Sequence, residues 1–256
     1  MLAIERRNII LGKLREAGSV SVGVLAAEFG VSEETIRRDL ERLEKENGIV
    51  KTYGGAVLAD GSAREPSYTD RMRTNAEAKK RLAALAARLV QDGDSVILDA
   101  SSTAVFVARA LKSKKDITLI TNSVEVLAEL SDASGWRILS TGGVLSGDSG
   151  ALVGARAEEA LSAYRADKAI LSCKGISADG FFDSDDLQAS VKRKMLAAAG
   201  QKIFAADGSK LGRRAFARIC PLGGADAFIT DRKPSEEWGK LFAGEGTDIL
   251  YDEGRE

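Results

Sequence analysis

The side chains best suited to chemistry in the first quarter of the chain lie on one short polar stretch. Residues 32–42 read SEETIRRDLER, in which Ile36 and Leu40 recur at the four-residue spacing of a buried helix face. The polar side chains between them then point outward, and arginine suits guanine O6/N7 or phosphate through its bidentate fork. On this helix we predict contacts with double-stranded DNA from Ser32, Thr35, Arg37, Arg38 and Arg42.

The elements around that stretch are those of a winged helix-turn-helix. Gly30 lies where a preceding helix must end, and Ser32 precedes the second helix as its cap. Residues 49–58 (IVKTYGGAVL) place strand-forming residues on both sides of a Gly-Gly turn, which predicts a hairpin wing. In this wing, contacts with the phosphate backbone are expected from Lys51, Thr52 and Tyr53.

Charge alone does not identify this N-terminal part as a DNA-binding domain. Residues 1–58 contain nine Lys/Arg and nine Asp/Glu, so the domain is not basic. A small helical protein-interaction module is therefore the alternative. The order of glycine turn, serine cap, arginine pair and Gly-Gly hairpin favours DNA binding.

In the rest of the chain, polar groups recur directly after apolar strand-like runs. We predict strands at 95–99, 117–120, 137–140, 168–172, 202–206, 227–230 and 248–251, with helices near 103–111, 124–130, 155–163, 188–199 and 235–243. This alternation predicts an α/β domain with a mostly parallel sheet, which binds ligands beyond the carboxyl ends of its strands.

The polar groups expected at that edge suit a phosphorylated, polyhydroxylated ligand. Hydroxyls and unpaired amides at a helix start favour phosphate, and glycines let the backbone approach a ligand closely. The candidate effector-binding residues are Asp99, Ser101, Ser102, Thr103, Thr121, Asn122, Ser123, Gly142, Gly143, Lys174, Lys192, Asp207 and Lys210. Each motif alone is commonly only a cap or a turn.

Length and composition set the remaining bounds. The 256 residues allow two domains, which we place at 1–58 and 75–256 with a linker at 59–74. The chain contains no histidine, which excludes Ser-His-Asp and Cys-His triads and His-ligated zinc. We expect no cofactor and no metal. Two cysteines, no long apolar run and no signal-peptide pattern predict a cytoplasmic protein without a membrane span.

The run TIRRDLERLEKENGIVKTYGGAVL resembles the N-terminal signature of DeoR-type bacterial transcriptional regulators. LDASSTAVFVARAL, ITNSVEVLAEL, ADKAILSCKGISADGFFD and VKRKMLAAAGQKIFAADGSKLG are similar to segments of the same family, in the same order. The resemblance implies a ribose-5-phosphate-isomerase-like effector domain that binds a sugar phosphate. It also implies a homodimer or homotetramer that represses a carbohydrate-metabolism operon.

Three positions depart from the family pattern. Ser101 stands where glycine is common, Ala104 where threonine is common, and Lys174 where Asp or Asn is frequent. Carboxylates near the last position transfer protons in the related isomerases, so Lys174 argues against catalysis.

Two other classes of protein stay open at this point. An aldose–ketose sugar-phosphate isomerase with an accessory N-terminal domain would use Asp99 or Asp207 with Lys192. A scaffold with a vestigial pocket would leave the predicted wing unexplained.

Overall fold

The computed structural model describes residues 2–17, 19–47, 49–52, 54–58, 68–147 and 149–252. Its contacts divide the chain into two compact units, Met1–Glu65 and Pro66–Glu256. Each unit is described by itself.

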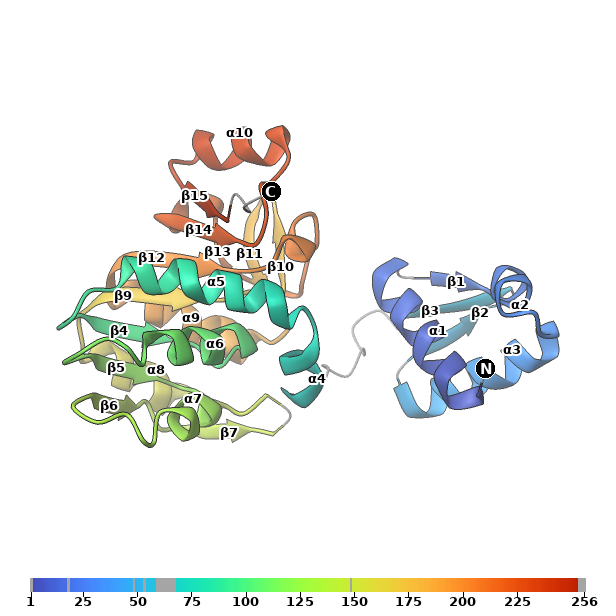
Figure 1. Ribbon diagram of the computed structural model, residues 1–256, viewed down its shortest axis with the longest axis horizontal. Helices are drawn as coiled ribbons and strands as arrows, with labels where there is room; N and C mark the ends of the chain where they lie inside the picture. Colours follow the sequence, from blue (N-terminus) through green and yellow to red (C-terminus); the bar gives the residue numbers. More distant parts are fainter. Residues whose placement is uncertain are drawn as a thin grey trace. The chain divides into compact units, whose positions relative to one another are not determined.

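The first unit has the winged helix-turn-helix order. Its elements are α1 (Ala3–Ala17), β1 (Ser19–Ser21), α2 (Val22–Phe29), α3 (Glu33–Asn47), β2 (Ile49–Thr52) and β3 (Gly55–Leu58) (Figure 1). Gly30 ends α2 in the left-handed region at φ 63°, as its position predicts. The helices close over one apolar core made by Ile10, Leu14, Leu25, Ile36, Leu40 and Leu43.

Strand β1 is absent from the sequence prediction. It pairs antiparallel with β3, which gives the sheet order β1-β3-β2. Gly55 makes this pairing possible, because a Cβ at that position would lie 1.8 Å from the carbonyl oxygen of Val20. Gly55 therefore serves the close approach of β1 as well as the turn.

A seven-stranded sheet forms the centre of the second unit. Its strands are β4 (Ser95–Leu98), β5 (Thr118–Thr121), β6 (Arg137–Ser140), β9 (Ala166–Leu171), β12 (Ala199–Ala205), β14 (Ala227–Thr230) and β15 (Asp248–Tyr251). The order is β15-β14-β12-β9-β4-β5-β6, and every neighbouring pair is parallel. The predicted parallel sheet is confirmed, and each predicted strand corresponds to one of these seven.

Helices cover both faces of this sheet, because alternate strand residues are apolar on both sides. On one face, Val96 and Leu98 belong to the apolar cluster of α5 (Ala76–Leu89), α6 (Ser102–Leu111) and α7 (Val124–Glu129). On the other face, Ile97 belongs to the cluster of α8 (Ala155–Ser162), α9 (Asp186–Ala197) and α10 (Glu236–Gly244). In Figure 1, α5, α6 and α7 lie in front of the sheet and α8 and α9 lie behind it.

Several short elements of the second unit lack a pattern in the sequence. They are α4 (Tyr68–Arg73), the hairpin of β7 (Val144–Ser146) and β8 (Ala151–Val153), the antiparallel sheet of β10 (Gly175–Ser177), β11 (Gly180–Asp183) and β13 (Ala217–Cys220), and the short helices η1 (Gly208–Lys210) and η2 (Leu222–Gly224). Helix α4 lies inside the predicted linker 59–74. Its six residues are too few for an apolar period, and tertiary contacts hold it, since Arg71 donates to the carbonyl oxygen of Ser149 at 3.2 Å.

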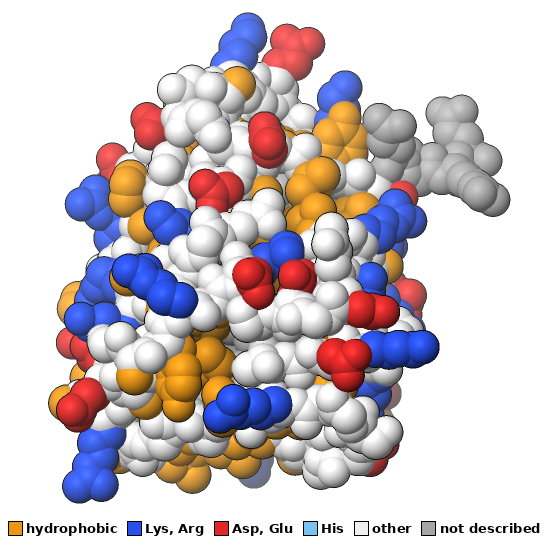
Figure 2. Space-filling model, turned by 90° about the vertical axis from the view of Figure 1, so that its left-hand side faces the viewer, with side chains coloured by type: hydrophobic (Ala, Val, Ile, Leu, Met, Phe, Trp, Pro, Cys, Tyr) orange, Lys and Arg blue, Asp and Glu red, His pale blue; other side chains and the backbone are white. Residues whose placement is uncertain are grey.

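The surface of the second unit carries no single-sign field on the face in Figure 2. Acidic and basic side chains are interspersed there, with small apolar patches between them. In the described part of the chain, no helix combines the length and the apolar composition needed to cross a bilayer.

Candidate functional site

Helix α3 presents the arginine-bearing face that the sequence predicts. Ile36 and Leu40 are buried, whereas the side chains of Arg37 and Arg38 are 51% and 76% exposed. Ser32 caps the helix, because its Oγ accepts a hydrogen bond from the amide of Thr35 at 3.3 Å. Ser32 and Arg42 are also exposed, and Thr35 is half-buried.

Carboxylates of the same helix hold both arginines. Arg37 Nη2 lies 2.5 Å from Glu33 Oε2, and Arg38 Nε lies 3.2 Å from Glu34 Oε1. Exposed pairs one helical turn apart are worth only about 0.3–0.5 kcal/mol. Nucleic-acid phosphates or bases can therefore displace the carboxylates at little cost.

A buried ion pair that the sequence analysis missed fixes α3 against α1. Asp39 is 4% exposed, and its Oδ2 accepts from Arg6 Nε at 2.5 Å. Arg7 approaches the other oxygen at 3.5 Å. Asp39 stands three residues after Ile36 and four before Leu43, on the buried face, but only the packing of α1 shows which cation meets it.

The wing carries two of its three predicted contact residues on the described strand β2. Lys51 and Thr52 are exposed, and Lys51 Nζ lies 2.9 Å from Glu41 of α3. The Lys51 amide donates to Glu44 Oε1 at 3.1 Å, so the start of the wing is tied to α3. Tyr53 lies outside the described residues.

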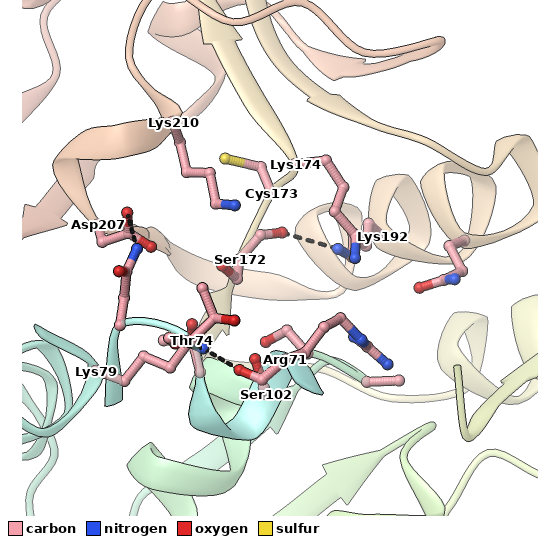
Figure 3. A pocket seen from close by; sticks show the side chains of 15 residues that line it. Arg71, Thr74, Lys79, Ser102, Ser172, Cys173, Lys174, Lys192, Asp207 and Lys210 are labelled. Carbon is pink, nitrogen blue, oxygen red and sulfur yellow. Dashed lines mark hydrogen bonds between the residues drawn. The ribbon is translucent and has the colours of Figure 1, made fainter. Parts of the chain in front are cut away.

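The second unit has a cavity of about 170 Å³ beyond the carboxyl ends of β4, β9 and β12. Figure 3 shows side chains from different elements converging on it, with Lys174 and Lys210 above and Lys79 and Ser102 below. The lining consists of Arg71, Thr74, Asn75, Lys79, Ala100, Ser101, Ser102, Thr103, Ser172, Cys173, Lys174, Gln188, Lys192, Asp207 and Lys210.

One wall of this cavity is the N-terminus of α6. Ser101 caps the helix by accepting from the Ala104 amide at 3.0 Å, and its own hydroxyl donates to Asp99 Oδ1 at 2.6 Å. Ser102 and Thr103 follow in the first turn, where amides lack acceptors within the helix. Amides and dipole together make this wall suitable for an anion.

Lys192 lies at the junction of β4, β9 and β11. Its Nζ contacts Asp183 Oδ2 at 2.6 Å and Asp99 Oδ2 at 2.9 Å, and donates to the Ser172 carbonyl oxygen at 2.8 Å. Burial by itself disfavours the ammonium, but the charges of Asp183 and Asp99 outweigh it and raise the Lys192 pKa above its usual value. Burial likewise opposes ionisation of Asp183, yet Lys192 keeps that pKa below its usual range. Lys192 and Asp183 are therefore both charged at neutral pH.

Lys79 joins the cavity to α4. Its Nζ donates to the carbonyl oxygens of Arg71 and Thr74, the latter at 2.6 Å. Burial lowers its pKa to about 8, although the charge of Asp207 acts in the opposite direction. The charge of Lys79 therefore changes near pH 8.

The structure brings seven of the predicted effector residues to this cavity and places Asp99 directly behind it. Those lining it are Ser101, Ser102, Thr103, Lys174, Lys192, Asp207 and Lys210.

The other predicted residues are not in the described lining and have local roles. Ser123 caps α7, Thr121 accepts from the Ser123 amide at 3.1 Å, and Asn122 donates to the Leu152 carbonyl oxygen at 2.9 Å. Gly142 turns the chain at φ 62°, and a Cβ on Gly143 would lie 2.6 Å from the Val153 carbonyl oxygen.

The cavity residues of α4, the α4–α5 turn and α5, together with Ser172 and Cys173 after β9, were not predicted from the sequence. Arg71 and Thr74 fall inside the predicted linker, and Lys79 looks like a solvated helix residue. Cys173 also lines the cavity, but burial raises the pKa of its thiol to about 12, so it is neutral and unreactive.

Comparison with known families accounts for both units. Residues 6–61 match the DeoR-like helix-turn-helix domain, and residues 74–232 match the DeoR C terminal sensor domain. The chain belongs to the DeoR family of transcriptional regulators. The cavity therefore lies in a DeoR sensor domain, and α3 in a DeoR helix-turn-helix.

Among DeoR-family relatives, the chain is 38% identical to the HTH-type transcriptional repressor GlcR of Bacillus subtilis, over 98% of both chains. It is 32% identical to the glycerol-3-phosphate regulon repressor of Escherichia coli, over 91% of this chain and 93% of that protein. Among solved structures, ribose 5-phosphate isomerase A of Methanocaldococcus jannaschii aligns with a TM-score of 0.40 and 18% identity, over 54% of this chain and 55% of that one.

Proposed function

We propose that this DeoR-family regulator represses a carbohydrate-metabolism operon and that a phosphorylated sugar in the sensor cavity controls it. The main support for this proposal is the excess of positive charge among the side chains that line the cavity. Among the described residues, the lining carries five cationic side chains, those of Arg71, Lys79, Lys174, Lys192 and Lys210, and one carboxylate, that of Asp207. Asp99 and Asp183 already compensate Lys192, so four cationic side chains face the ligand against one carboxylate. Such an excess favours a ligand with about two negative charges, as a phosphate monoester has near pH 7.

The phosphate is assigned to the α6 wall. Ser102 and Thr103 offer hydroxyls and first-turn amides there, and Lys210 supplies a flexible ammonium from η1. Lys79 uses two of its three N–H bonds on backbone carbonyls, which leaves one for the ligand.

The sugar hydroxyls are assigned to the amide and carboxylate side chains of the cavity. Asn75 Nδ2 donates to Asp207 Oδ1 at 3.1 Å, so these two side chains are already oriented. Gln188 lies on the opposite helix α9 and is 4% exposed. A carboxylate accepts from hydroxyls, and amides both donate and accept, which suits a polyol.

The relatives support the regulatory part of the proposal. Both compared proteins are named repressors, and one is the repressor of a glycerol-3-phosphate regulon. In our proposal, α3 reads the major groove with Arg37 and Arg38 while the wing contacts phosphates. Two or four chains bind repeated half-sites, because a homodimer or homotetramer matches the symmetry of such an operator.

The sugar phosphate is bound without being converted. Catalysis by Lys192 would need a free proton or lone pair, but its three N–H bonds meet Asp183, Asp99 and the Ser172 carbonyl oxygen. The group placed to shuttle a proton is thus fully used in holding the fold.

A thermal-shift screen of the full chain tests the ligand class. Sugar phosphates and the matching free sugars are compared, and a ligand at 100 times its Kd stabilises by about 2.7 kcal/mol. We expect stabilisation by a phosphorylated sugar only, and about a tenfold loss of its affinity in Lys210→Met. The matched control is Lys240→Met, an exposed lysine on α10 outside the cavity. Equal stabilisation by the free sugar, or equal binding by Lys210→Met, would refute the assignment.

A further inference from the structure

A second cavity adjoins the sensor cavity within the same unit. It measures about 470 Å³ and lies beyond β12 and β14, next to the first turn of α5. Its lining consists of Arg73, Asn75, Ala76, Glu77, Ala78, Arg81, Asp207, Ser209, Asp231 and Arg232. The family match and the proposed ligand site leave this cavity without a role.

Two turns form the boundary between the cavities. In the α4–α5 turn, Thr74 lines the first cavity, Arg73 the second and Asn75 both. In η1, Lys210 lines the first cavity and Ser209 the second, while Asp207 before them lines both. The turns meet through the Asn75–Asp207 hydrogen bond of 3.1 Å. The side chains of Asn75 and Asp207 therefore separate the two cavities. A ligand that spans both cavities would pass over these two side chains and could form hydrogen bonds with them.

The three carboxylates of the second cavity are already engaged. Glu77 accepts from Lys80 at 2.7 Å, and Asp231 accepts from the Gly208 amide at 2.7 Å and lies 3.6 Å from Arg81. Asp207 accepts from Asn75 Nδ2 and from the Ser209 amide, both at 3.1 Å.

Two arginines of this cavity are not neutralised. Within the described part of the chain, neither Arg73 nor Arg232 has a carboxylate partner, and both are exposed. The second cavity therefore offers two guanidinium groups that no described carboxylate pairs directly, and their planar fork matches phosphate oxygens.

Arg232 is held at the boundary. A Cβ on Gly208 would lie 2.6 Å from Arg232 Nε, so the guanidinium end packs against the backbone of η1. Gly208 is two residues from Lys210 of the first cavity. The absence of a side chain at Gly208 is what admits the arginine here.

From this geometry we propose that the second cavity is an anion subsite and that the effector is a sugar with two phosphate groups. One phosphate occupies the α6 wall of the first cavity, the sugar crosses Asn75 and Asp207, and the second phosphate binds Arg73 and Arg232. The inference rests on the proposed sugar-phosphate function and narrows its ligand class.

The test compares monophosphates with bisphosphates on the full chain by calorimetry. The probes are fructose 1-phosphate, fructose 6-phosphate, fructose 1,6-bisphosphate and the corresponding glucose phosphates. We expect a bisphosphate to bind at least about tenfold more tightly than either of its monophosphates. The double variant Arg73→Gln/Arg232→Gln should remove that advantage and leave monophosphate affinity unchanged. The control Arg88→Gln changes an exposed arginine of α5 outside both cavities and should change nothing.

Each outcome separates this inference from the proposed function. A monophosphate that binds as tightly as its bisphosphate overturns the second subsite and leaves the first intact. If none of these sugars binds, crystals soaked in inorganic phosphate decide the matter. Anions in both cavities support the inference, and an anion in the first cavity alone overturns it. Failure of the proposed function would appear instead as an empty first cavity.

Discussion

Lys192→Met should destabilise the second unit more than any exposed lysine substitution, because it leaves two buried carboxylates without their cation. Asp99 and Asp183 are both 0% exposed, and their distances to Lys192 Nζ are 2.9 and 2.6 Å. Removing one member of a buried ion pair costs about 3–5 kcal/mol. With an m-value of about 2 kcal/mol/M, a loss of about 3 kcal/mol lowers the urea midpoint by about 1.5 M.

Tryptophan fluorescence reports this change selectively, since both tryptophans, Trp136 and Trp238, lie in the second unit. Lys112→Met is the matched control. It removes the same charge from surface ion pairs with Asp132 and Glu129 and should lower the urea midpoint far less. A Lys192→Met variant as stable as this control would show that Asp99 and Asp183 do not need the cation.

The sign of the pH dependence gives a second check on the same variant. In the wild type, Lys192 keeps the Asp183 pKa low, so this stabilisation is present above the ordinary pKa and is lost as pH falls through the lowered one. In Lys192→Met, burial raises the Asp183 pKa, and the folded state then binds more protons than the unfolded state. The difference in the free energy of unfolding between the wild type and Lys192→Met should therefore become smaller as the pH falls from 7 to 5. A constant difference would show that Asp183 does not carry the penalty.

Three further results are expected. Arg37→Ala or Arg38→Ala should weaken operator binding at least tenfold in a mobility-shift assay. The melting temperature should stay the same, because each arginine is exposed. Unchanged affinity in both variants would show that neither arginine contacts the DNA. Gly55→Ala should abolish DNA binding, because the added Cβ would collide with strand β1, while the unfolding of the second unit reported by tryptophan stays the same. Gly54 has open space around it, so the control Gly54→Ala should bind DNA normally. Effector affinity should fall between pH 7 and 9 as Lys79 loses its proton near pH 8, and a Lys79→Met variant that keeps this fall would exclude that lysine as its cause.

The sheet was predictable because each strand is a short apolar run followed by polar turn residues. The run ending before Asp99 shows this, since Val96, Ile97 and Leu98 are all fully buried and the chain turns directly after them. The strands are then expected to run parallel, because a helix lies between most consecutive strands and returns the chain to the same edge of the sheet. Strand β1 gives no such signal, because Ser19–Ser21 has three residues and depends on the missing side chain of Gly55.

The ligand cavity was predictable only in part, because the same local pattern serves caps and ligands. Ser101 and Ser123 each precede a helix and each accept from the amide three residues on, yet only Ser101 lines the described cavity. Arg71 shows the opposite case. It lies in a segment without periodicity, and its place in the cavity depends on contacts with residues far along the chain, such as Ser149.

Control of DNA binding by a sugar phosphate is tested most directly by measuring operator affinity with and without that ligand. Duplex DNA selected by the full chain from a random pool is titrated by fluorescence anisotropy, with the ligand from the thermal-shift screen absent or saturating. We expect the sugar phosphate to change DNA affinity by about 5- to 150-fold, which corresponds to a coupling of about 1–3 kcal/mol. Lys210→Met should show no change at the same ligand concentration. Unchanged affinity of the wild type at saturating ligand would contradict the control of DNA binding by a sugar phosphate.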